Sequence, residues 1–129
     1  MILEKAWAKL HGSYSFIVSG HSSEVYVKLC KSPCESVYHM EMDEGRLWYL
    51  MRRATELSYH MSTGSADEKL SSAQLSGVKH NHAYGILCAH EISIKGTKWR
   101  MLKLRNPWGH MEWTGNWKFS DPKWTAEAK

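Results

Sequence analysis

The chain has 129 residues, of which 43% are hydrophobic, 12% aromatic and 23% charged, a composition typical of one folded domain spanning 1–129. No run approaches the roughly 18 apolar residues that a membrane-spanning helix needs, and "MILEKAWAKL" lacks the pattern of a signal peptide. The net charge is +4, but Lys and Arg are scattered, so no nucleic-acid partner is expected. Free thiols in an intracellular, cytoplasmic protein are predicted from an odd cysteine count without framework spacing: Cys30, Cys34 and Cys88.

The first half of the chain predicts two helices. Apolar residues recur at helical spacing from Ile2 to Leu10, and this helix is expected to stop at His11-Gly12. Turn-rich pieces between Ser13 and His39 indicate irregular structure, within which the alternating segment "EVYVKL" could form a strand. A second amphipathic helix is predicted in "DEGRLWYLMRRATELSYHM", which starts at Asp43 with acidic residues that favour a helix N-terminus.

The second half predicts a mobile loop and then a β-hairpin. Residues 62–77 are rich in Ser, Gly and charge and poor in large apolar groups, which favours a mobile surface loop. Two β-type runs joined at Lys95-Gly96-Thr97 predict an antiparallel hairpin over 82–105. The last third is expected to bring aromatic core beside this hairpin, because it holds five of the seven Trp: Trp99, Trp108, Trp113, Trp117 and Trp124.

The hairpin brings two residues that can cooperate chemically to the same end of the sheet. His82 stands at the entry of the first strand and Asn106 directly follows the second, so antiparallel pairing makes them neighbours. An imidazole can accept the proton of a cysteine thiol, and an Asn amide oxygen can orient that imidazole. Pro107 would stiffen the backbone after Asn106, and Trp108 would cover the hydrogen bond against water.

Several motifs resemble the second catalytic subdomain of the calpain-type cysteine peptidases, which supplies His and Asn. They are "LEKAWAKLHGSY", "HAYGI", "KLRNPWG" and "EWTGNW", and they run in order from about Leu3 to Trp124. The resemblance implies a papain-like α+β fold, of which this chain is the mainly antiparallel β lobe with a few flanking helices. It also implies catalytic roles for His82 and Asn106, with Trp108 shielding the pair. Two positions depart from the family, because Asn81 and Gly85 stand where Gly and Ser are common.

The nucleophile implied by the resemblance is missing from these residues. In the family it lies in a "GDCW"-like helix start on a preceding lobe, with a Gln for the oxyanion hole. None of the three cysteines stands in that context, and Cys88 is six residues beyond His82, roughly 20 Å along an extended strand. The first hypothesis is therefore a lobe that hydrolyses peptide bonds in protein substrates when a Cys-bearing lobe, upstream or in trans, joins it. The alternative is a non-catalytic module that docks on a protein scaffold.

Calcium binding is a further implication of the resemblance. Such lobes can hold calcium through carboxylates in and beyond the "EWTG" motif, and Glu112 is the clean match here. Asp121 could act as a second ligand, although its spacing is shifted. Calcium takes six to eight oxygen ligands, so the site is expected to be incomplete in this chain alone.

Overall fold

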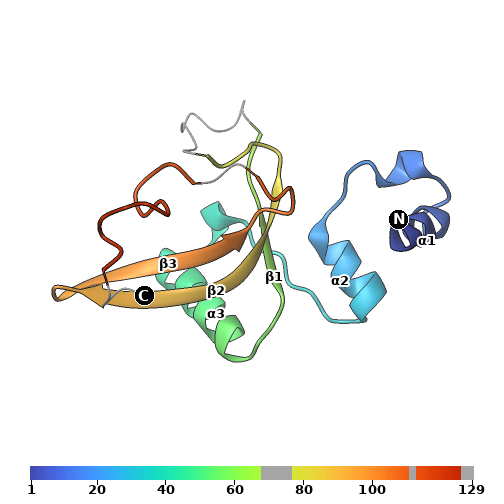
Figure 1. Cartoon of the computed structure of the whole chain (residues 1–129). Coiled ribbons are helices and arrows are strands. Elements are labelled where there is room, and N and C mark those ends of the chain that lie inside the picture. Colours follow the sequence, from blue (N-terminus) through green and yellow to red (C-terminus); the bar gives the residue numbers. More distant parts are fainter. Residues whose placement is uncertain (68–76, 111–112, 126–129) are drawn as a thin grey trace. The chain divides into compact units, whose positions relative to one another are not determined.

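Three α-helices and one three-stranded antiparallel sheet form within the residues that the computed structural model describes, namely 1–67, 77–110 and 113–125. Figure 1 shows the elements in chain order. This content confirms the predicted α+β class. Contacts divide the chain into two compact units, Met1–Val37 and Tyr38–Lys129, and the whole sheet belongs to the second.

The first unit contains the predicted N-terminal helix. Helix α1 (Ile2–Leu10) ends at His11, as expected from the change of pattern at His11-Gly12. A short 3-10 helix, η1 (Tyr14–Ile17), follows it. Ala8 is the buried hydrophobic residue of the described part of this unit, so its core is small.

The segment "EVYVKL" forms neither a strand nor irregular structure, and both expectations for it are wrong. It lies in helix α2 (Ser22–Cys30), which ends at Lys31 in the left-handed region with a φ of 53°. The Ser32 N–H donates to the Tyr26 carbonyl oxygen at 3.4 Å and closes the last turn. A helix satisfies its own backbone groups, whereas a strand needs a neighbour, and the described first unit contains no strand.

The second unit begins with a 3-10 helix, η2 (His39–Glu41), and the predicted second long helix, α3 (Glu44–Glu56). The Asp43 carboxylate caps α3 by accepting a hydrogen bond from the Arg46 N–H at 2.9 Å. The helix ends before "LSYHM" of the quoted segment, and Ser58 adopts a positive φ of 57° just beyond it.

The predicted hairpin is confirmed by strands β2 (Ala83–Ile94) and β3 (Thr97–Arg105). They pair antiparallel from Ile94 opposite Thr97 to Gly85 opposite Arg105, with a bulge between Ile86 and Cys88. Lys95 and Gly96 both have positive φ, 50° and 78°. Positive φ at both central residues is the requirement of the type I′ turn, whose twist matches that of paired strands.

Strand β1 (Met61–Gly64) corrects the start of the predicted loop. It pairs antiparallel with the first residues of β2, from Met61 opposite Ile86 to Gly64 opposite Ala83, so the sheet order is β1–β2–β3. Residues 62–64 are therefore strand and not loop. The expectation of mobility for 68–76 falls outside the described residues.

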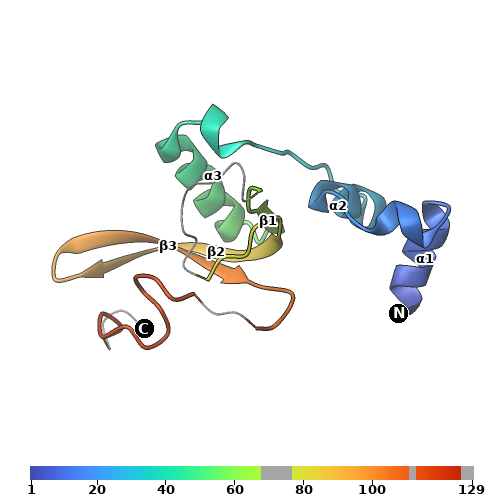
Figure 2. The same ribbon diagram turned by 90° about the horizontal axis from the view of Figure 1, so that it is seen from above.

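Helix α3 completes the edge of β2 where β1 stops. Figure 2 shows α3 lying over one face of the sheet. The Thr55 hydroxyl oxygen accepts from the Ala89 N–H at 2.9 Å and donates to the Met51 carbonyl oxygen at 2.8 Å. Arg52 Nη1 donates to the Ala89 carbonyl oxygen at 2.9 Å, and Ala89 is fully buried. Two side chains of α3 thus satisfy the backbone groups that a longer β1 would have paired.

Replacing Thr55 with Val should lower the free energy of unfolding by about 1 to 3 kcal/mol, because the buried Ala89 N–H loses its acceptor while the shape is kept. Urea unfolding followed by circular dichroism measures this change. Thr97→Val, at an exposed strand position, is the matched control and should stay within about 0.5 kcal/mol. Equal stability of the two variants would show that Thr55 does not join α3 to the sheet.

The expected aromatic residues beside the hairpin are present as a cluster, in which the Trp99 and Trp117 rings are 5.4 Å apart and the Trp117 and Trp124 rings 5.0 Å apart. In the described part of the second unit, the buried hydrophobic residues are Tyr84 and Ala89. Trp117 and Trp124 are half-buried, whereas Trp99, Trp108 and Trp113 are 38%, 49% and 46% exposed. The position of the aromatic residues was thus predicted, but not their burial, because aromatic content does not show which side chains are covered.

Candidate active site

His82 and Asn106 meet at one end of the hairpin. His82 directly precedes β2, and Asn106 directly follows β3. The register places Gly85 opposite Arg105, so Asn106 leaves β3 beside the first residues of β2, next to His82. His82 Nε2 lies 2.8 Å from Asn106 Oδ1, and His82 is 9% exposed. The pairing expected from the hairpin is therefore present in the fold.

The surroundings of Asn106 determine the direction of this hydrogen bond. Asn106 Oδ1 also accepts from the Trp108 N–H at 3.0 Å, and Asn106 Nδ2 donates to the His110 carbonyl oxygen at 2.7 Å. A backbone N–H can only donate and a carbonyl can only accept, so the amide has one consistent orientation. His82 Nε2 must then carry the proton and donate, which leaves the lone pair of the neutral ring on Nδ1.

A tight turn holds Asn106 in this position. The Gly109 N–H donates to the Asn106 carbonyl oxygen at 3.2 Å, and the bond from the Trp108 N–H to Oδ1 makes an Asx-turn. Pro107 fixes its own φ within the turn. Gly109 has a φ of +72°, a value that glycine adopts without strain. The stiffness that the sequence indicates around this Asn thus has a local hydrogen-bond basis.

Aromatic rings contact the imidazole. The centroids of His82 and Trp108 are 4.3 Å apart with the rings tilted by 54°, and Tyr84 meets His82 edge to face at 4.8 Å. Trp108 remains 49% exposed, whereas Tyr84 is 7% exposed. The contact that the shielding prediction for Trp108 requires is present, while shielding itself stays a prediction.

Asn81 shows why one departure from the family pattern is tolerated. Its φ is +49°, in the left-handed region, where Gly pays no steric cost and Asn is the usual alternative. The family commonly has Gly at this position, directly before the His. Asn therefore satisfies the same backbone requirement.

Calcium binding gains no further ligand from the structure. Glu112 lies outside the described residues. Both Asp121 oxygens accept backbone hydrogen bonds, from the Trp117 N–H at 2.7 Å and the Lys123 N–H at 3.0 Å. Within 1–67, 77–110 and 113–125, no group of three or more His, Cys, Asp or Glu side chains could hold a metal ion. Calcium stays a prediction, and the described residues alone do not form a site for it.

Asp121 instead organises the loop that follows the His82–Asn106 pair. The pKa of Asp121 is lowered from its ordinary value of 3.8, mainly by the hydrogen bond from the Lys123 N–H and next by the one from the Trp117 N–H. A lowered folded-state pKa means that the stabilisation is complete above 3.8 and is lost as pH falls through the folded value. The loop should therefore loosen in acid.

The indole N–H resonance of Trp124 reports on this loosening, because Trp124 Nε1 donates to the Lys118 carbonyl oxygen at 2.8 Å within the same loop. We expect the resonance to shift in the wild-type chain as pH falls below about 4. Asp121→Asn should show the shifted position already at neutral pH. An unchanged resonance in that variant would mean that the carboxylate does not hold the loop.

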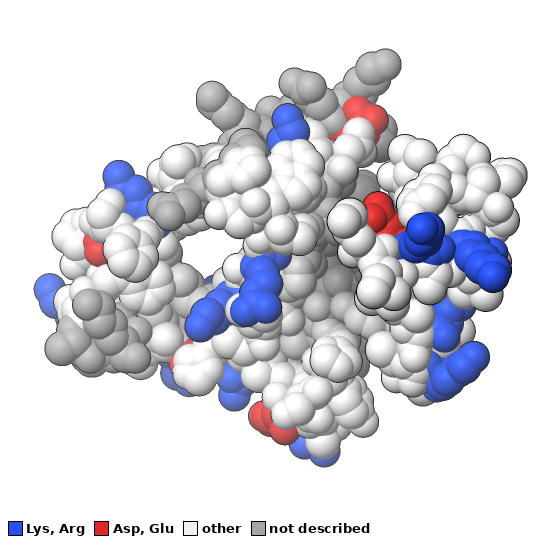
Figure 3. All heavy atoms as spheres, turned by 45° about the vertical axis from the view of Figure 1, so that its right-hand side comes forward, with Lys and Arg blue, Asp and Glu red and all other residues white. Residues whose placement is uncertain are grey.

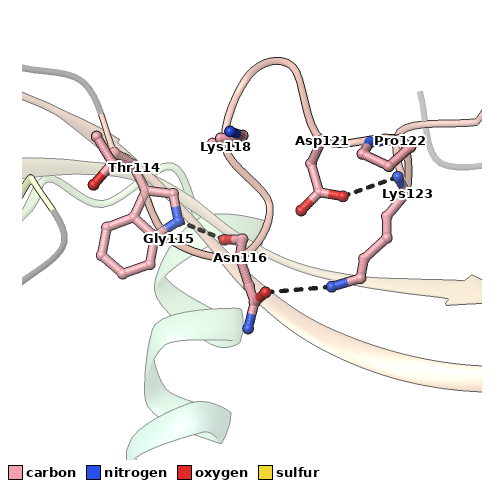
Figure 4. Close-up of a pocket in the computed structure, with 8 residues that line it drawn as sticks. Thr114, Gly115, Asn116, Lys118, Asp121, Pro122 and Lys123 are labelled. Carbon is pink, nitrogen blue, oxygen red and sulfur yellow. Dashed lines mark hydrogen bonds between the residues drawn. The ribbon is translucent and has the colours of Figure 1, made fainter.

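The same loop forms an open pocket lined by residues between Trp113 and Lys123, shown in Figure 4. In it, Asn116 accepts hydrogen bonds from Trp113 Nε1 through its carbonyl oxygen and from Lys123 Nζ through Oδ1. Neither His82 nor Asn106 lines this pocket. The hollow is thus separate from the pair that the sequence indicates as catalytic, and the pair carries the chemical argument.

None of the three cysteines is placed by the structure as the partner of His82. Cys30 and Cys34 are free and exposed and belong to the first unit. Cys88 is free and half-buried within β2, opposite Lys103 and beyond the bulge from His82. The expected absence of a nucleophile in this chain stays a prediction.

The distribution of charge and the length of the helices bear on nucleic-acid and membrane partners. On the face drawn in Figure 3, Lys and Arg side chains lie in several separate groups with Asp and Glu among them. Among the helices described, none is long and apolar enough to cross a membrane.

Sequence reasoning missed two residues that hold His82. Ser65 makes two hydrogen bonds to the His82 backbone: the Ser65 N–H donates to the His82 carbonyl oxygen at 2.9 Å, and the Ser65 Oγ accepts from the His82 N–H at 3.0 Å. Tyr84 contacts the ring. The spacing of two between His82 and Tyr84 could have placed them on one side of a strand, whereas nothing local marks Ser65.

Comparison with known proteins identifies the family of this chain. The family model described as calpain family cysteine protease matches residues 1–129. Because this match covers the whole chain, the chain belongs to the calpain family of cysteine proteases.

Individual relatives support the same assignment. Human Calpain-12 is 37% identical over 123 residues, which cover 95% of this chain and 17% of that protein. The "Calpain-type cysteine protease DEK1" of Zea mays is 33% identical over 135 residues, covering 99% of this chain and 6% of that protein. The "Calpain-2 catalytic subunit" of Gallus gallus is 31% identical over 131 residues, covering 97% and 18%. The chain thus spans less than a fifth of the length of these relatives.

Proposed function

We propose that this chain supplies the general base and its orienting amide to a calpain-type cysteine endopeptidase, and that a further lobe supplies the nucleophilic Cys. The observation that carries the proposal is the 2.8 Å hydrogen bond between His82 Nε2 and Asn106 Oδ1. Its direction leaves the Nδ1 lone pair of the neutral ring for a thiol proton. Among the described residues, His82 Nδ1 has no hydrogen-bond partner that would compete.

The chemistry begins with transfer of the thiol proton from Cys Sγ to His82 Nδ1. The resulting thiolate attacks the carbonyl carbon of the scissile peptide bond and forms a C–S bond. The imidazolium then returns the proton from Nδ1 to the leaving amine nitrogen as the C–N bond breaks. Water, deprotonated by the same ring, hydrolyses the thioester and restores the thiol. Throughout, Asn106 Oδ1 holds the Nε2–H and keeps Nδ1 directed at the reacting atoms.

An exposed apolar surface beside the pair supports a partner lobe. Leu102 and Leu104 share one face of β3, four and two residues before Asn106, and each is 41% exposed. Trp108, beyond the end of the strand, is 49% exposed and contacts the His82 ring. Clustered apolar groups of this kind are commonly covered by another protein surface. The partner is therefore a Cys-bearing lobe that closes over this end of the hairpin, with the protein substrate between the two.

The proposal also assigns the protein to the cytoplasm. The thiols of Cys30, Cys34 and Cys88 are free, and a reducing compartment keeps exposed thiols in that state.

Complementation tests the proposal. The chain is combined with a calpain Cys-bearing lobe, as a mixture and as a single polypeptide, and hydrolysis of a fluorogenic peptide is followed. We expect turnover that requires both the Cys of the added lobe and this chain. His90→Ala is the control, because His90 is an exposed residue of β2 away from Asn106 and should leave turnover unchanged.

Formation of a stable complex without turnover, in both formats, would contradict the catalytic proposal. That outcome would instead support the alternative of a non-catalytic calpain-like interaction module. The two lobes could also fail to associate in the mixture. The single polypeptide distinguishes that outcome from a loss of catalysis, because its two lobes associate within one chain.

A further inference from the structure

A small hydrogen-bond network lies behind His82, on residues outside the catalytic pair. Ser65, directly after β1, exchanges two hydrogen bonds with the His82 backbone, at 2.9 Å to its carbonyl oxygen and 3.0 Å from its N–H. Two bonds to one residue fix both its position along the strand and the plane of its peptide groups. Ser65 thus continues the β1–β2 pairing by one residue, up to the point where the imidazole begins.

Tyr84 holds the other part of His82, the ring. Its own ring meets the imidazole edge to face, with centroids 4.8 Å apart and planes at 87°. Tyr84 is 7% exposed, so its ring has little freedom to move. The Tyr84 hydroxyl oxygen accepts from the Lys79 N–H at 2.8 Å, which anchors the far end of the side chain.

The backbone of Lys79 joins these two supports. Its carbonyl oxygen accepts from the Ser65 hydroxyl, while its N–H donates to the Tyr84 hydroxyl oxygen. One peptide segment is therefore held between the residue that fixes the His82 backbone and the residue that contacts the His82 ring. Because the hydroxyl of Ser65 has one proton, donating it to Lys79 leaves its lone pairs to accept from the His82 N–H.

We infer that Ser65 and Tyr84 are positioning residues of the catalytic imidazole and that they act as one unit through the backbone of Lys79. The inference rests on the proposed function for its catalytic consequence, but its structural part concerns His82 alone. Both residues contact His82 on sides other than the one bound to Asn106, so they add to the Asn106 bond by limiting where the ring can sit. A ring held at the backbone, at one edge and at Nε2 keeps Nδ1 aimed at one place.

The test is a double-mutant cycle with Ser65→Ala, Tyr84→Phe and the combination of both. Tyr84→Phe keeps the aromatic contact and removes only the anchor to Lys79, so it should fold. The matched controls are Ser93→Ala, at an exposed position of β2, and Tyr49→Phe, at a position 64% exposed on α3. The primary readout is the fraction of neutral His82 protonated at Nε2, measured from ring ¹⁵N shifts in the 129-residue chain alone.

We expect both single variants to lower the Nε2–H fraction and both controls to leave it unchanged. In the complemented enzyme, each single variant should lower kcat about tenfold while KM stays within about twofold, since the ring is misdirected and the substrate contacts remain. The double variant should lose less than the product of the two single losses, because either change already frees Lys79.

An Nε2–H fraction equal to wild type in both single variants would overturn the inference, whatever happens to kcat. Strictly multiplicative losses would overturn the coupling through Lys79. Inactivity of the complemented wild-type enzyme would count against the proposed function. It would not affect the test of Ser65 and Tyr84, because the Nε2–H fraction of His82 is measured without an added lobe.

Discussion

Replacing His82 with Gln is expected to lower kcat of the complemented enzyme by a factor on the order of 10³ to 10⁴, because the thiol then has no base of suitable pKa in reach. Gln keeps a polar side chain that can still donate to Asn106 Oδ1, so the turn after β3 should persist. The measurement is the initial rate of peptide hydrolysis at saturating substrate, with the amount of active complex fixed by size-exclusion chromatography.

His90→Gln is the matched control for this substitution. His90 lies on the same strand, opposite Met101, and is exposed. It should retain the wild-type rate. A His82→Gln enzyme that keeps more than about a tenth of the wild-type kcat would contradict the assignment of His82 as the base.

Asn106→Ala has the second largest expected effect, a fall in kcat of about a hundredfold or more, because the imidazole loses the acceptor that fixes its tautomer. The neutral ring should then populate both tautomers, and Nδ1 would point toward the thiol only part of the time. The variant also frees the Trp108 N–H, which is near the surface and can bond to water. The fold should therefore be largely kept.

Asn106→Asp separates orientation from charge. A carboxylate can still accept from His82 Nε2 and from the Trp108 N–H, but it cannot donate to the His110 carbonyl oxygen. We expect Asp to preserve the Nε2–H tautomer that Ala loses and to recover part of the rate. If NMR showed the His82 ring unchanged in tautomer and mobility in Asn106→Ala, the pairing would carry no catalytic meaning.

The parts of the fold that the sequence predicts are those with strong local signals. The hairpin follows from two β-type runs around Lys95-Gly96, whose positive φ values suit a two-residue turn. Its antiparallel geometry alone places His82 beside Asn106, so the main contact of the site could be predicted from spacing. Helix α3 is likewise marked by its acidic start and its Asp43 cap.

The errors arise where long-range pairing decides the structure. Val25, Val27 and Leu29 alternate with polar residues as in a strand, yet all three lie in α2 and are 37% to 47% exposed. Strand β1 consists of Met-Ser-Thr-Gly, which has weak strand propensity, and it exists because β2 offers it a partner. Tertiary partners are not visible in a local pattern.

The difference between local patterns and long-range contacts also explains which site residues could be predicted from the sequence. His82, Asn106 and Trp108 stand in short recognisable motifs, whereas Ser65 reaches His82 only through the pairing of β1 with β2. Tyr84 lies in "HAYGI", but its anchor on the Lys79 backbone is a contact that no spacing rule predicts. The residues that perform the chemistry are thus easier to predict than those that hold them in place.

The most direct test of the central claim is the protonation state of the neutral His82 ring in the wild-type chain, read from long-range ¹H–¹⁵N NMR correlations. We predict the tautomer with the proton on Nε2, donated to Asn106 Oδ1, and a lone pair on Nδ1. A ring protonated on Nδ1 would contradict the account, because Asn106 Oδ1 would then face a lone pair and the nitrogen left for the thiol could not accept its proton.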